Sequence, residues 1–195
     1  MEGCGYNAAT HDAMPNRIKL VRSLAICLAV AVPLAVVTLF AATSVRAYVW
    51  HIRHGDSIMF AQWRVPIPKG YFEAGANSFF KLSFGSPFWK AAPWGHISLS
   101  LNPSQPPAPV SYDRIEAATI RVAAEEGYQL QARRRIQSAS DNCYCFEFSR
   151  QSDTSLVDIR CMTDSAELAV IFDGHRRFSN DVYSVVSGLE RLPSK

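Results

Sequence analysis

One uncharged stretch of 23 residues, SLAICLAVAVPLAVVTLFAATSV, dominates the hydrophobic pattern of this chain. It runs from Ser23 to Val45 and follows three basic residues, Arg17, Lys19 and Arg22. At about 1.5 Å per residue, a helix of this length reaches roughly 34 Å, which is enough to cross a hydrocarbon core of about 30 Å. The stretch therefore predicts a transmembrane helix that anchors the rest of the chain to a bilayer.

A cleavable signal peptide is the alternative interpretation of the same stretch. Val45, Arg46 and Ala47 form a small-x-small site, and cleavage after Ala47 would release a secreted domain. Signal peptides carry an apolar core of about 7 to 15 residues, so the longer stretch favours a retained anchor. Close to the stretch, the amino-terminal side carries Arg17, Lys19 and Arg22 and the other side carries only Arg46 and Arg53, so we expect the short amino-terminal segment to be cytoplasmic. The prediction is a cytoplasmic tail (1–22), an anchor (23–45) and one extracytoplasmic domain (48–195).

Beyond the anchor, the pattern of apolar and polar positions predicts an α+β domain. Short extended or alternating segments predict strands at 49–52, 57–60, 63–71, 79–84, 95–101, 128–136, 143–149, 156–162 and 168–172. Helical spacing and capping residues predict one helix at 112–126 and a last one from near Ser179 to near Pro193. This order favours a mainly antiparallel sheet packed with two helices, an α/β sandwich.

The segment WRVPIPKGY at 63–71, the later β-meander and the closing helix together resemble the PsbP-like α/β sandwich superfamily. The resemblance covers the order of elements from Trp63 onward. It implies an accessory, assembly or binding domain rather than an enzyme. The superfamily offers no catalytic motif to match here, so the resemblance assigns no functional residue.

Charge in the domain is nearly balanced. The region after residue 47 carries 16 Lys and Arg against 15 Asp and Glu, which argues against a nucleic-acid partner. The run Arg133-Arg134-Arg135 is expected in a strand, with Arg133 and Arg135 facing solvent. The sequence has no Gly-x-Ser-x-Gly elbow and no Gly-rich phosphate loop, so we expect no cofactor and favour a non-enzymatic role.

Three of the five cysteines, Cys143, Cys145 and Cys161, lie in the domain. If the apolar residues of the predicted hairpin share one face, Cys161 points away from the other two. We therefore expect buried thiols, while a bridge involving Cys161 would need a bulge in the hairpin. C-x-C lacks the C-x-x-C spacing of zinc knuckles, so no metal site is expected.

The best candidate for a ligand site lies between the last strand and the last helix. His175, Arg176 and Arg177 would combine free amides at a helix start with two guanidiniums, a combination that holds anions. The alternative is a solvated basic turn neutralised by Asp173 and Asp181. The same three residues would centre an alternative function, an extracytoplasmic hydrolase or anion-dependent enzyme.

Aromatic residues gather between 79 and 94, and three of them, Phe88, Trp89 and Trp94, suggest a surface that recognises a protein partner. Aromatic residues are more often part of a core. The leading hypothesis is a single-pass membrane-anchored protein that touches the bilayer through residues 23–45. Its extracytoplasmic domain would serve a binding, accessory or assembly role towards an envelope protein.

Overall fold

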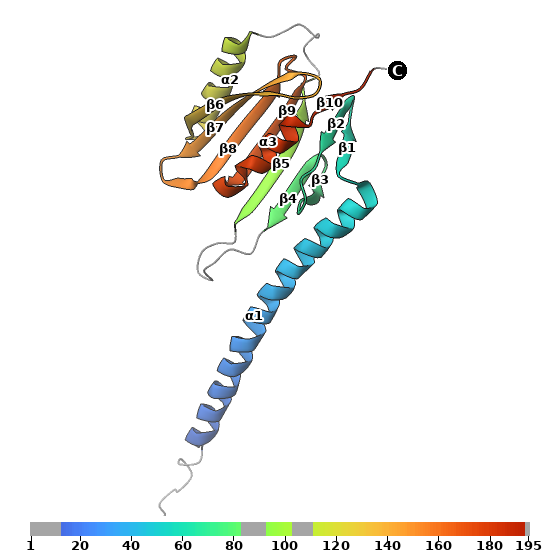
Figure 1. Ribbon diagram of the computed structural model, residues 1–195. Helices are drawn as coiled ribbons and strands as arrows, with labels where there is room; N and C mark the ends of the chain where they lie inside the picture. The colour runs from blue at the N-terminus through green and yellow to red at the C-terminus, as the bar shows by residue number, and fades with distance from the viewer. Residues whose placement is uncertain (1–12, 83–92, 103–110, 194–195) are drawn as a thin grey trace, which may run out of the picture. The chain divides into compact units, whose positions relative to one another are not determined.

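The computed structural model describes residues 13–82, 93–102 and 111–193. The chain divides into two compact units, Met1–Ala42 and Thr43–Lys195. The second unit is an α+β domain with antiparallel sheets and few helices, as the hydrophobic pattern predicts (Figure 1).

Helix α1 spans Ala13–His54 and contains the apolar stretch. Its segment Val21–His54 has a mean hydropathy of 2.7 over its most apolar window, and none of that window is buried. In the described residues this is the one helix long and apolar enough to cross a membrane, judged by length and composition. The Thr38 hydroxyl donates to the carbonyls of Leu34 (3.0 Å) and Ala35 (2.8 Å), so it needs no water.

The end of α1 corrects the prediction of a strand at 49–52, because the helix continues to His54. Ala47 and Trp50, three residues apart on one helical face, are 2% and 7% exposed and belong to the core of the domain. The Trp50 ring meets Phe79 edge-on with centroids 5.6 Å apart. Burial of this face stabilises a helix where the local sequence favours extended structure.

Seven strands form one antiparallel sheet. In spatial order they are β3 (Phe72–Gly75), β4 (Ser78–Leu82), β5 (Trp94–Leu101), β9 (Leu168–His175), β8 (Asp153–Thr163), β7 (Asn142–Arg150) and β6 (Gln129–Gln137). A second sheet consists of β1 (Ser57–Phe60), β2 (Trp63–Pro66) and β10 (Glu190–Arg191). Short β3 and β10 were not predicted. The order makes β6 an edge strand of the larger sheet.

The two faces of the larger sheet are covered by different elements. One face bears the main core, to which the 3-10 helix η1 (Arg176–Phe178) and helix α3 (Ser179–Ser187) contribute Phe178, Val182, Val185 and Val186. Helix α2 (Tyr112–Glu125) packs on β6 and β7 on the other face, over Phe146 and Phe148. Helix α3, the last helix, ends at Ser187, which is earlier than the sequence predicts, and the chain then forms β10.

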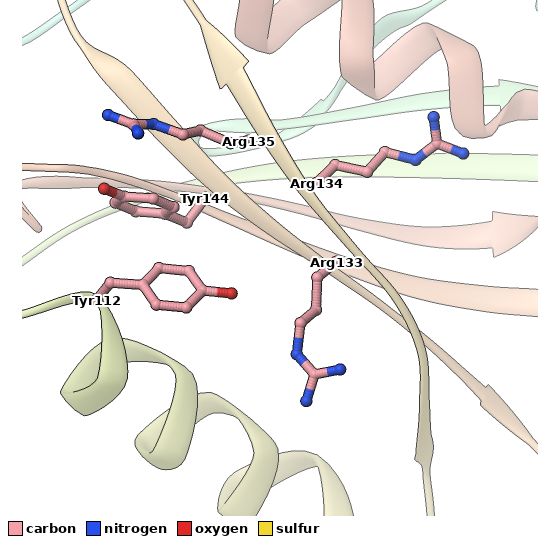
Figure 2. A pocket seen from close by; sticks show the side chains of 5 residues that line it. All are labelled: Tyr112, Arg133, Arg134, Arg135 and Tyr144. Atoms are coloured by element: carbon pink, nitrogen blue, oxygen red, sulfur yellow. The ribbon is translucent and has the colours of Figure 1, made fainter.

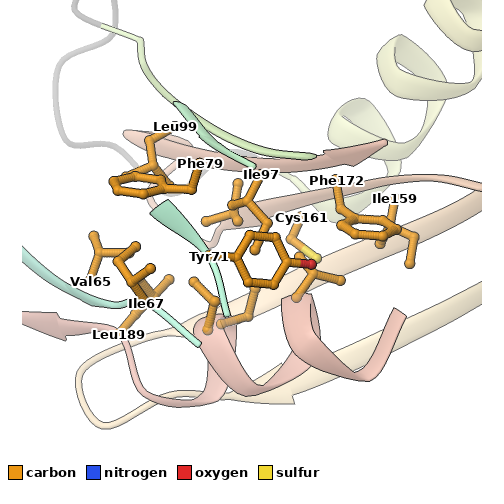
Figure 3. Close-up of a cluster of buried hydrophobic side chains, with 14 of the residues drawn as sticks. Val65, Ile67, Tyr71, Phe79, Ile97, Leu99, Ile159, Cys161, Phe172 and Leu189 are labelled. Carbon is orange, nitrogen blue, oxygen red and sulfur yellow. The ribbon is translucent and has the colours of Figure 1, made fainter. Parts of the chain in front are cut away.

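Two paired glycines shape the main core. Gly95 on β5 lies opposite Gly174 on β9, and a Cβ at Gly95 would lie 2.6 Å from the Tyr71 hydroxyl. A Cβ at Gly174 would lie 2.6 Å from the Trp94 carbonyl oxygen. Gly95 therefore leaves room for the Tyr71 hydroxyl, and Figure 3 shows Tyr71 in one buried cluster with Ile97, Cys161 and Phe172. Burial, reinforced by the negative charge of Asp181, raises the pKa of the Tyr71 hydroxyl.

A disulfide joins Cys145 on β7 to Cys161 on β8, with a Cα–Cα distance of 4.0 Å. The expectation that Cys161 faces away is therefore wrong. It assumed one apolar face, whereas β7 is buried on both faces, so its phenylalanines and its cysteines lie on opposite sides. The two cysteines are direct cross-strand partners and need no bulge. Cys143 is a buried free thiol, as expected, and burial raises its pKa to about 12.

Candidate functional site

The predicted ligand segment 175–177 starts from an arginine that the fold itself uses. Arg176 donates from Nη1 to Glu147 Oε1 at 2.5 Å and from Nε to the Thr154 carbonyl at 3.1 Å. The Glu147 side chain is only 7% exposed and also accepts from the Tyr183 hydroxyl at 3.1 Å. Burial and the charge of Glu147 raise the pKa of Tyr183 to about 12, so it stays a neutral donor. Arg176 thus ties η1 to strand β7.

Of the two neighbours of Arg176, His175 is half-buried and Arg177 is exposed. His175 caps η1, and its Nδ1 accepts from the Arg177 amide at 3.5 Å. Arg177 is exposed, with its guanidinium 4.6 Å from the centroid of the Phe178 ring. Asp181, which the solvated-turn alternative pairs with this segment, binds Lys81 instead, at 2.9 Å. The three residues are consecutive, but the Arg176 side chain is bound to Glu147 while Arg177 lies over Phe178. Their use as a ligand site stays a prediction.

Of the predicted partner surface, the structure describes one residue. Trp94 begins β5, is partly buried, and stacks on Phe80 with centroids 6.5 Å apart. Phe88 and Trp89 lie outside the described residues. A recognition role for these aromatic side chains also stays a prediction.

A hollow at the edge of the larger sheet combines arginines with tyrosines. It has a volume of about 370 Å³ and is lined by Tyr112, Arg133, Arg134, Arg135 and Tyr144. Figure 2 shows Arg133 and Arg135 on the same side of β6 as the two tyrosines, with Arg134 directed to the opposite side. This is the alternation of a regular strand. Tyr112 comes from the first residue of α2, and its ring lies 4.7 Å from the ring of Tyr144 on β7.

The guanidiniums of the hollow are only partly neutralised. Arg133 Nε donates to Glu116 Oε1 at 2.6 Å. Arg135 lies 5.6 Å from the centroid of the Tyr144 ring, and Arg134 lies 4.7 Å from that of Tyr183. Within residues 13–82, 93–102 and 111–193, neither Arg134 nor Arg135 forms an ion pair. Planar guanidiniums beside aromatic rings bind carboxylates and phosphates in a fork geometry, so the hollow is suited to an anionic group.

From the sequence alone, Arg133 and Arg135 are ordinary solvent-facing side chains of a strand, and both are exposed in the structure. The sequence carries the triplet as a signal, but it does not show that β6 is an edge strand. That follows from the non-sequential strand order and from the placement of α2, which brings Tyr112 to the triplet.

A row of polar side chains crosses the strands on the same face as α2. Arg160 on β8 donates from Nε to Asp158 Oδ1 at 2.9 Å and from Nη2 to Asp158 Oδ2 at 3.0 Å, and it also donates to Glu126. Asp173 on β9 lies between Asp158 and His96 in the register. Burial and the negative charge of Asp158 raise the pKa of Asp173. Among the described side chains, no group of three or more His, Cys, Asp or Glu is placed to hold a metal ion.

No protein-family model matches the chain, and no curated protein sequence matches it. Among solved structures, the chain is similar to the solution structure of cyanobacterial PsbP (CyanoP) from Synechocystis sp. PCC 6803. The identity is 12%, the TM-score is 0.39, and the match covers 69% of this chain and 91% of the other. The likeness is one of fold alone.

Proposed function

We propose that this is a single-pass membrane protein whose domain lies outside the cytoplasm and binds a partner there in an accessory or assembly role. The observation that carries the proposal is α1, whose large apolar side chains are solvent-exposed at positions from Val21 to Val45, a length sufficient to cross a bilayer.

The disulfide supports an extracytoplasmic location. Disulfides persist in oxidising compartments and are rare where glutathione and thioredoxin keep thiols reduced. The Cys145–Cys161 bridge lies in the main core, between strands β7 and β8. A bridge in that place is part of the folded state rather than an exposed, transient one.

The path of α1 supports a retained anchor over secretion. Cleavage after Ala47 would cut the helix at a residue that is 2% exposed in the core and would leave Trp50 on a frayed end. A helix that continues through this site keeps both Ala47 and Trp50 in the core of the domain.

Paired reporters fused after Lys195, one active only outside the cytoplasm and one only inside, test this proposal. We expect activity from the outside reporter alone, with the fusion retained in membranes after alkaline carbonate washing. As a matched control, three arginines inserted after Val45 should weaken or invert the signal, because Lys and Arg near a span set its orientation. An inside signal from the unmodified chain overturns the proposal.

A further inference from the structure

The free edge of β6 is the feature of the domain best suited to a partner. β6 is nine residues long and pairs only with β7, so its other side has no hydrogen-bonded strand among the described residues. In an antiparallel pair, alternate residues direct their amide and carbonyl groups away from the partner. An incoming extended segment can use these groups to extend the sheet.

The arginine side chains along this edge favour an incoming segment that is negatively charged. Arg135 and Arg133 lie on the α2 face beside the hollow, and Arg134 lies on the α3 face beside Tyr183. Guanidiniums therefore flank the edge on both faces. Of these three arginines, only Arg133 has a carboxylate partner in the described part of the chain, and that partner, Glu116, is a residue of the same domain.

A second copy of this chain fits the edge poorly. Two β6 strands paired with each other in antiparallel fashion would bring arginine triplets close together, and like charges on opposed strands are destabilising. Charged edge strands also guard sheets against self-association. The charges that repel a copy attract an extended segment rich in Asp or Glu.

We infer that the edge of β6, with the hollow lined by Tyr112, Tyr144 and the arginine triplet 133–135, binds an extended acidic segment of a partner protein by adding it as an eighth strand to the larger sheet. This inference rests on the proposed function, because it names the partner chemistry of the proposed binding domain. Alternate side chains of the added strand meet Arg134 on one face and Arg135 on the other.

The test uses the whole chain in nanodiscs of neutral lipid and a capped decapeptide of five Glu-Thr repeats as the probe. Hydrogen–deuterium exchange, read by mass spectrometry, should slow in peptides covering 129–137 and remain unchanged in those covering β3 at the other edge. Two control peptides separate the contribution of charge from that of backbone hydrogen bonds. Gln in place of Glu removes the charge, and N-methylation of every backbone amide removes the donors while keeping the charge.

Two protein variants move the binding in opposite directions. Arg135→Gln removes an exposed guanidinium that has no ion pair in the described residues, and it should weaken binding roughly three- to fivefold. Glu116→Gln releases Arg133 and should strengthen binding by about threefold. Arg121→Gln, at an exposed position of α2, is the matched control and should leave binding unchanged.

The inference is overturned if no probe protects β6, or if the Gln peptide or the N-methylated peptide protects it as well as the Glu-Thr peptide. It is also overturned if only anionic lipid added to the nanodiscs protects β6, which would assign the edge to a membrane surface. Topology is read separately by the reporter fusions. An outside signal without peptide protection therefore rejects this inference alone, while an inside signal rejects the proposed function.

Discussion

Arg176 and Arg133, whose ion pairs lie on opposite faces of the β6–β7 hairpin, differ in how deeply their carboxylate partners are buried and how far their charge is neutralised. On the α3 face, Arg176 reaches a carboxylate, Glu147, that is 7% exposed and is shared with Tyr183. On the α2 face, Arg133 pairs with Glu116 while 54% exposed, and Arg135 has only the ring of Tyr144. The first arrangement stabilises the fold, and the second leaves positive charge available to a ligand. Whether an arginine stabilises the fold or stays available to a ligand therefore depends on which carboxylates the fold places beside it.

Removing the disulfide of the α3 face should have the largest effect on stability. The double variant Cys145→Ala/Cys161→Ala should lower the free energy of unfolding by roughly 3 kcal/mol, since the bridge closes a loop with a sequence separation of 16. Urea denaturation with and without reductant measures this. Cys143→Ala is the control, because it should keep the reductant sensitivity that the double variant loses. Equal stability of the oxidised chain and the double variant would contradict the assignment.

The matched substitutions Glu147→Gln and Glu116→Gln test the comparison most sharply. Glu147→Gln should cost about 2 kcal/mol, because it leaves Arg176 without its charge partner and weakens the acceptor for Tyr183 at a buried site. Glu116→Gln should cost less than about 0.5 kcal/mol, as expected for an exposed ion pair. Denaturation midpoints of the two variants, measured side by side, show whether the two losses of stability differ. Similar losses in both would remove the distinction between the faces.

The arginines themselves should give a smaller contrast. Arg176→Gln should lower the free energy of unfolding by about 1 kcal/mol, because this side chain is 44% exposed and solvent screens its ion pair. Arg135→Gln should change it by less than about 0.5 kcal/mol. Thermal unfolding at matched ionic strength measures both. A loss at Arg135 as large as that at Arg176 would mean that the edge arginines are structural.

The smallest expected effect concerns Asp173 and pH. Its pKa is raised in the folded state by burial and by Asp158, so the folded protein binds this proton more tightly than the unfolded chain. Ionisation of Asp173 therefore destabilises the fold as pH rises from the ordinary carboxyl pKa through the raised one. Asp173→Asn should slightly increase the melting temperature at neutral pH and make no such difference below the ordinary carboxyl pKa. An equal effect at both pH values would contradict this origin.

The sequence predicts the larger elements because their hydrophobic periods are local. The strand at 57–60 and the strands of the meander from Gln129 to His175 are confirmed, and α2 starts at the predicted Tyr112. The segment 49–52 is misassigned because its helical state depends on burying Trp50 against distant residues. The short strands β3 and β10 have too few residues to show a period.

The cysteine pairing and the hollow were not predictable for a related reason. Both depend on which faces are covered and on which strands are neighbours. β7 has apolar residues on both faces, so alternation alone misplaces Cys161 relative to Cys145. Similarly, no local pattern identifies β6 as the edge or brings Tyr112 beside Arg133.

The central claim is that the domain folds around a disulfide outside the cytoplasm while still attached to its apolar helix. The intact mass of the protein, extracted from native membranes and alkylated in denaturant without reductant, tests both parts at once. The account predicts a chain that retains residues 23–45 and has Cys145 and Cys161 joined, with the other three cysteines, Cys4, Cys27 and Cys143, alkylated. A chain beginning at Tyr48, or one with all five thiols alkylated, would contradict it.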